Sequence, residues 1–372
     1  MSAFGAGTAG ESAGARIGRH KRFESPARPV RMDILRSVRA VAEAEGPGVV
    51  DWDRAASAAK EATDPGSIAI SDAERAGYAA DVRDARSRLT EVAGIEFDVP
   101  DTVEVQNRHH WIDASVGTFR RVMDPIEAAA ADPGGPDGTF DATPAKRGPA
   151  FAQDVSRVAN TGSMAFALGF LSRNVLGQYD PLLLAETDPS DRDHGLYFVH
   201  PNIVRVADEL DVPYPRFRRW IAFHEVSHAA EFGAAPWLST HLENRLERGV
   251  DGLVAGDIDR EAFRELDTAM TAVEGYAELL MDRAFDEDYA DLRAKLDARR
   301  QGGGPVARLA RRLLGLGLKR RQYERGAAFF EAVADARGLA GASVVWDRPE
   351  YLPTEDELDA PERWLARVEN EA

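Results

Sequence analysis

The segment that most constrains the fold of this chain runs from Pro215 to Gly233 and contains the motif HExxH at residues 224–228. A proline suits the first turn of a helix, a glycine followed shortly by a second proline suits its end, and no residue between them breaks a helix. Residues four apart lie on one helical face, so the imidazoles of His224 and His228 can bind one metal ion. The motif therefore predicts a long helix that carries two ligands of a metal site.

Glu225 follows the first of these histidines and completes the chemistry of a zinc hydrolase. Two neutral imidazoles hold Zn²⁺, and an open position keeps a water whose pKa the metal lowers towards ~7. The carboxylate of Glu225 can then accept the proton as a general base. The apolar residues Phe217, Trp220 and Ile221 share the face of the histidines, which predicts that the site points into the protein. The alternative is a helix with two core or surface histidines and no metal.

A second helix, expected over residues 257–284, offers further ligands. Glu274 and Glu278 lie on its apolar face, flanked by Val273 and Met281. Carboxylates among apolar side chains are costly unless a cation or hydrogen bonds offset their desolvation. A zinc ion would do this for Glu274 as third ligand, and Glu278 could accept a hydrogen bond from the free ring nitrogen of a zinc-bound histidine. The alternative is that both acids reach solvent or pair with arginines.

Composition narrows the classes of partner and compartment. The 63 acidic residues outnumber the 46 basic ones and give a net charge of −17, which argues against a nucleic-acid partner. The sequence has no cysteine, so any metal must use His, Asp or Glu. No window reaches the ~18 apolar residues of a membrane span, and the first thirty residues lack the apolar region of a signal peptide. We expect a soluble, cytoplasmic protein with no membrane partner. Its many acids and few lysines resemble halophilic proteins.

The sequence predicts three regions. Residues 1–30 form a low-complexity, disordered tail, residues 31–145 a helical N-terminal region, and residues 146–372 the catalytic region with a C-terminal helical extension. The match to GxGxxG at residues 5–10 is discounted as a nucleotide site, because no strand can precede it.

The expected fold class is mainly α (α+β), with little β-structure. Residues 96–105 are expected to form a loop, and residues 195–200 a short strand. A strand just before the metal helix can lie along the cleft as an edge strand and pair with an extended peptide. His200 at the end of this strand could face the cleft, although a plain structural role is expected.

Short motifs along most of residues 48–370 indicate a family. They are Val50-Asp51-Trp52-Asp53, Leu176-Gly177-Gln178-Tyr179-Asp180, Pro201-Asn202-Ile203, Phe223-His224-Glu225-Val226-Ser227-His228, Pro236-Trp237-Leu238, Glu274-Gly275, and Arg321-Gln322-Tyr323 with Gly326. In these motifs the chain resembles the zincin-like family of predicted zinc-dependent metallopeptidases, some members of which are labelled coenzyme F-420 biosynthesis-associated.

The resemblance implies a zincin-like metallopeptidase fold with an HExxH active-site helix, a short edge strand and surrounding helices. It also implies zinc on His224 and His228, Glu225 as general base and Glu274 as third ligand. The family has Asp where this chain has Glu278, and the longer side chain changes how a ligand histidine could be contacted.

Two further assignments concern the third metal ligand and the residue that stabilises the oxyanion. The gap between His228 and Glu274 is long, which leaves His241 and Glu243 as rival third ligands. Tyr323 is the candidate for stabilising the oxyanion.

Two functions from different classes follow. The first is a gluzincin-type zinc metallopeptidase, with Zn²⁺ as cofactor and a peptide or protein as substrate. The second is a catalytically inactive zinc-binding scaffold whose basic helix, residues 308–325, docks a partner. Glu225 favours the enzyme, because zinc binding alone does not require this carboxylate.

Overall fold

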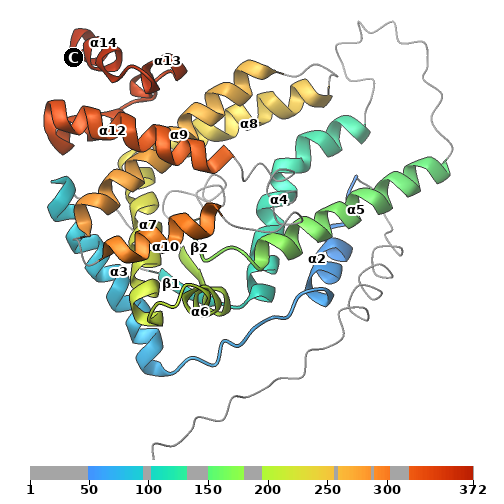
Figure 1. The fold of residues 1–372 in the computed structure, drawn as a ribbon. Helices are drawn as coiled ribbons and strands as arrows, with labels where there is room; N and C mark the ends of the chain where they lie inside the picture. Colours follow the sequence, from blue (N-terminus) through green and yellow to red (C-terminus); the bar gives the residue numbers. More distant parts are fainter. Residues whose placement is uncertain are drawn as a thin grey trace, which may run out of the picture.

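The computed structural model describes residues 49–94, 102–131, 150–179, 195–254, 259–285, 289–301 and 318–371, which form a mainly helical protein with one small sheet (Figure 1). The expected tail, the GxGxxG match and residues 308–317 of the basic segment lie outside the described residues. The helices are α2 (Trp52–Glu61), α3 (Asp72–Ala93), α4 (Arg108–Ala131), α5 (Ala150–Ser172), α6 (His200–Glu209), α7 (Tyr214–Ala234), α8 (Leu238–Val254), α9 (Arg260–Ala284), α10 (Ala290–Gln301), α12 (Leu318–Ser343), α13 (Glu355–Leu358) and α14 (Pro361–Glu371), with 3-10 turns at Val344–Trp346 and Pro349–Tyr351. None of these helices combines the length and apolar character needed to cross a bilayer.

The described sheet has three strands, β1 (Thr102–Gln106), β2 (Gly177–Tyr179) and β3 (Gly195–Val199), in the order β1-β3-β2. β3 pairs in parallel with β1 and antiparallel with β2. Segments of both predicted regions, residues 31–145 and 146–372, therefore contribute to one sheet. The mainly α fold class is confirmed.

Two expectations about strands were wrong. The strand expected to be an edge, β3, is the central strand, and the edge beside the metal helix is β2. Part of the loop expected over residues 96–105 forms β1. Both errors have one cause, since short strands are stabilised by pairing with a distant segment, and three to five residues carry little periodicity.

The boundaries of the main helices follow local signals. α3 begins with a capping box in which Ser71 and Glu74 bind each other's backbone N–H groups, and it ends at Gly94 with a positive φ of 67°. Asp259 caps α9 by accepting a hydrogen bond from the backbone of Ala262. These caps place the two long helices that pack against α7.

Helix α7 lies in the larger hydrophobic core and is buried on nearly all its faces. α3 packs along one side of it, and α9 and β2 contact it elsewhere (Figure 1). Phe217, Phe223 and Val226 are fully buried on different sides of the helix. Because water is excluded around α7, its polar side chains need partners within the protein.

Two glycines bring α12 against α9 beside Glu274. A side chain on Gly275 would collide with the backbone of Gly326, and a side chain on Gly326 would collide with the carbonyl oxygen of Thr271. Only glycine permits so close an approach of two backbones. This contact places α12, which continues into the C-terminal helices drawn in red in Figure 1, directly against the part of α9 that carries Glu274.

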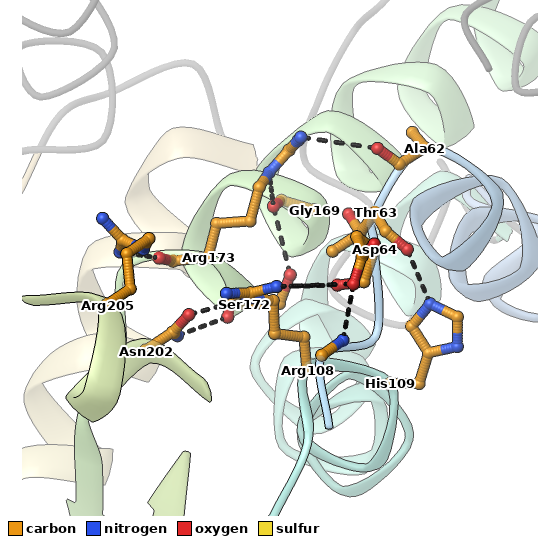
Figure 2. A network of polar contacts seen from close by, with 11 residues as sticks. Ala62, Thr63, Asp64, Arg108, His109, Gly169, Ser172, Arg173, Asn202 and Arg205 are labelled. Carbon is orange, nitrogen blue, oxygen red and sulfur yellow. Dashed lines mark hydrogen bonds and ion pairs between the residues drawn. The ribbon is translucent and has the colours of Figure 1, made fainter. Parts of the chain in front are cut away.

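A polar network joins the end of α5 to α4, α6 and the segment after α2, as Figure 2 shows. The fully buried amide of Asn202 donates to the carbonyl oxygens of Ser172 (2.8 Å) and Val175 (2.6 Å). Arg108 donates to Asn202 Oδ1 (2.7 Å) and to the carbonyl oxygen of Asp64 (3.0 Å). The chain just before β2 is thus held by side chains of α4 and α6.

Candidate metal centre

The two histidines of the motif lie one turn apart on α7, and Glu274 approaches them from α9. The ring centroids of His224 and His228 are 4.7 Å apart. One ligand atom from each of His224, His228 and Glu274 lies within 4.8 Å of the others. His228 Nε2 is 3.8 Å from Glu274 Oε2. The three side chains converge as a set of nitrogen and oxygen donors of the kind that zinc prefers.

Glu231 holds His228 in orientation. The Nδ1–H of His228 donates to Glu231 Oε2 at 3.0 Å, and Glu231 is fully buried. In the neutral imidazole this hydrogen bond places the ring proton on Nδ1, so the lone pair of Nε2, which lies 3.8 Å from Glu274 Oε2, is available for a metal. The carboxylate partner expected of a zinc-bound histidine is therefore present, but it comes from α7 itself.

The expectation for Glu278 was wrong. Glu278 forms an ion pair with Arg293 of α10 and lines a small cavity with Trp220 and Phe285. The reason is its position on α9, four residues beyond Glu274, where α10 supplies an arginine. Pairing with an arginine was the alternative that the sequence left open.

Glu225 points towards β2. A Cβ atom placed on Gly177 would lie 2.7 Å from Glu225 Cδ and 2.8 Å from Glu225 Oε1. The side chain of Glu225 therefore occupies the space that any other residue at position 177 would fill. Glu225 is 7% exposed and lines the cavity described below.

An aromatic ring supports the first histidine. The indole of Trp220 stacks on the imidazole of His224, with centroids 5.7 Å apart and planes inclined by 12°. Trp220 precedes His224 by one helical turn, so this contact follows from the sequence spacing. It restricts rotation of the His224 ring.

A cavity of about 530 Å³ opens beside these groups. We call it the metal-site cavity. It is lined by Thr118, Gly177, Gln178, Tyr179, His224, Glu225, His228, Phe232, Leu242, Leu246, Leu266, Met270, Val273 and Glu274. Its size falls within the roughly 300–1,000 Å³ typical of ligand sites.

The charges around the cavity fit a bound cation. Glu225, Glu231 and Glu274 are 7%, 0% and 3% exposed, and no described residue lining the cavity is Lys or Arg. Burial lowers the pKa of His228, but Glu231 and Glu274 outweigh it and raise that pKa to about 9. Burial raises the pKa of Glu231 to about 8. Buried carboxylates without a cation are costly, so the residues present suit a divalent metal ion.

The other candidate residues lie elsewhere. His241 lines a different cavity, between α8, α9 and residues 352–356, and neither His241 nor Glu243 belongs to the converging set. His200 is buried at the start of α6, where its Nδ1 contacts the hydroxyls of Tyr78 (3.0 Å) and Tyr214 (3.2 Å). The side chain of Tyr323 is outside the described part of α12, so its role stays a prediction.

Two site residues were missed from the sequence. Glu231 follows His228 by three residues, so the helical period already puts the two on neighbouring positions. Gly177 had no such signal, because its importance depends on a carboxylate 48 positions later in the chain.

Comparisons with known proteins match most of the chain. A family model described as zincin-like metallopeptidase matches residues 50–260 and 253–365. The structure is similar to the crystal structure of a proposed hydrolase with a novel fold from Chloroflexus aurantiacus, with a TM-score of 0.65 and 27% sequence identity over 92% of this chain and 99% of the other. No curated protein matches the chain significantly.

Proposed function

Because the chain belongs to the zincin-like metallopeptidase family, as its motifs predicted, we propose that it is a zinc-dependent peptidase of the gluzincin type. His224, His228 and Glu274 would hold the ion. The observation that carries the proposal is the carboxylate of Glu225, which lines the cavity beside this donor set without being part of it. A scaffold that only binds zinc has no use for such a carboxylate.

The chemistry divides between the ion and the side chains. A zinc ion at this site supplies a Lewis acid that makes water a usable nucleophile near neutral pH. Glu225 accepts the proton of the attacking water as the new C–O bond forms, and it then gives that proton to the leaving amine as the C–N bond breaks. When His228 is neutral, its hydrogen bond to Glu231 favours the tautomer with the proton on Nδ1 and leaves Nε2 free to bind the ion.

The edge strand supports an extended peptide as substrate. β2 pairs with β3 on one side, and its three residues all line the metal-site cavity. An extended peptide can add to such an edge through backbone hydrogen bonds. We also propose a cytoplasmic location, as expected from the sequence.

The test is Glu225→Gln, which removes the basic carboxylate and keeps its size. The zinc-loaded variant should retain about one zinc per chain and its melting temperature. Hydrolysis of a broad peptide mixture in high salt, followed by mass spectrometry, should fall by ~10²–10⁴-fold. Glu243→Gln is the matched control, since Glu243 lies on α8 outside the donor set, and it should cleave like wild type.

Two results would contradict the proposal. A fully zinc-loaded wild type that cleaves no peptide would favour the inactive scaffold. A Glu225→Gln variant as active as wild type would remove Glu225 from the mechanism.

A further inference from the structure

One side of the metal-site cavity is an apolar surface built by three helices. Its members are Phe232 of α7, Leu242 and Leu246 of α8, and Leu266, Met270 and Val273 of α9. We call this surface the apolar wall. It lies within the same cavity as the donor set, so a group bound there is close to the reacting atoms.

Helical spacing explains how the wall reaches the metal ligands. Leu266, Met270 and Val273 recur at intervals of four and three residues, so they form one stripe along α9. Glu274 directly follows this stripe and lines the same cavity. Leu242 and Leu246 are four apart on α8, which contacts α9. The wall and the third donor are therefore parts of one continuous surface.

The wall offers no partner for a charged side chain. Apart from His224, Glu225, His228 and Glu274, the described residues that line the cavity carry no charge. Gln178 already accepts a hydrogen bond from Trp111 Nε1 at 2.6 Å. A charged side chain would lose its hydration here without compensation, whereas an apolar side chain would gain by leaving water.

We propose that the apolar wall binds a bulky apolar side chain, such as that of leucine, methionine or phenylalanine, next to the scissile bond. The substrates would then be peptides with such a residue at one position flanking the cut. This assignment depends on the proposed peptidase function, but the binding that it describes can be measured without turnover.

The first test measures binding of hydroxamates, which chelate zinc, to the zinc-loaded full chain. Three dipeptide hydroxamates that differ in one side chain are compared by calorimetry: isobutyl as in leucine, carboxyethyl as in glutamate, and aminobutyl as in lysine. The isobutyl compound should bind at least about ten-fold more tightly than either charged one, in line with the discrimination of apolar pockets. Equal affinities, or no measurable affinity for the isobutyl compound, overturn the assignment.

A pair of variants locates the preference on the wall. Leu246 is half-buried in the wall, and Asn244 is exposed on the same helix outside the cavity. Leu246→Glu should shift the preference towards the aminobutyl compound, with a change in the affinity ratio of at least about ten-fold. Asn244→Glu adds the same charge and should leave the ratio unchanged.

A second variant covers the case in which Leu246→Glu does not fold. Leu246→Ala keeps the wall apolar but enlarges it, so affinity for the isobutyl compound alone should fall. If the ratio of affinities is the same in wild type and in every folded Leu246 variant, the wall does not select the side chain.

Peptide cleavage by the same preparations separates the two proposals. Cleavage without any preference for an apolar residue beside the cut would leave the peptidase function intact and overturn the role of the wall. The hydroxamate preference without cleavage of any peptide would support the wall and count against the peptidase.

Discussion

Two cavities of similar size lie on either side of α9, and they differ in how their acidic side chains are paired. The metal-site cavity has a volume of about 530 Å³. The second cavity, of about 600 Å³, lies between α8, α9 and residues 352–356. Leu266, Met270 and Glu274 face the first, whereas Glu261, Glu265 and Thr268 face the second, as expected for opposite sides of a helix. Volume alone does not distinguish a site from a gap between elements.

In the second cavity, arginines neutralise the acids. Arg245 pairs with Glu265 at 3.1 Å, and Arg264 approaches Glu355 at 3.8 Å. Burial and the neighbouring Arg245 lower the pKa of His241 to about 4, so this histidine is neutral at neutral pH. In the metal-site cavity the carboxylates instead meet histidines and have no arginine among the described lining residues. The comparison teaches that buried carboxylates beside histidines suit a bound cation, whereas acids already paired with arginines do not.

The largest expected difference is in zinc content, between His228→Ala and His241→Ala. Wild type should bind about one zinc per chain, His228→Ala should bind almost none, and His241→Ala should match wild type, because only His228 belongs to the converging donor set. Elemental analysis after dialysis measures this. A greater loss in the His241 variant would make the second cavity the metal site.

Next in size is the effect of Gly177→Ala on catalysis. The new methyl group would displace the Glu225 carboxylate, and misplacement of a catalytic group by about 1 Å costs roughly 10²-fold in rate. Peptide hydrolysis should fall by about that factor while zinc content stays at the wild-type value. Gly117→Ala on α4 is the control, since a methyl group there meets no atom within 4 Å. Full activity in Gly177→Ala would mean that β2 moves and Glu225 does not.

A smaller effect separates Glu231 from Glu278. Glu231→Gln weakens the hydrogen bond that orients His228, so zinc affinity should fall by about 10 to 100-fold. Glu278→Gln alters only the pair with Arg293 and should leave zinc affinity unchanged. Competition with a fluorescent chelator measures both. An effect confined to Glu278 would restore the role that the sequence predicted for it.

The smallest effect is expected in the second cavity. Glu265→Gln removes partly exposed ion pairs with Arg245 and Arg248, so the free energy of unfolding should change by less than about 1 kcal/mol. Zinc content and cleavage should not change. Urea denaturation at low and high salt measures the first, and the difference should shrink at high salt. Loss of zinc in this variant would show that the two cavities are coupled.

The sequence by itself determined what depends on spacing within one helix. His224, Glu225 and His228 lie in one turn of α7, and the helical period sets their relative positions whatever surrounds them. The capping residues of α3 and the apolar stripe of α9 are local in the same sense. The family followed from the same short motifs and is confirmed by the match over residues 50–260 and 253–365.

The tertiary structure decided everything that depends on how separate elements meet. Glu274, rather than His241 or Glu243, lies beside the two histidines because of which face of α9 packs against α7, and no spacing in the sequence encodes that rotation. Glu278 pairs with Arg293 because α10 packs beside α9, and His228 has its carboxylate partner in Glu231 of its own helix. The edge strand is β2 because its three residues pair with β3, and so short a strand has no pattern of its own. Local periodicity is a property of the chain, whereas contacts between distant segments arise only when the core packs.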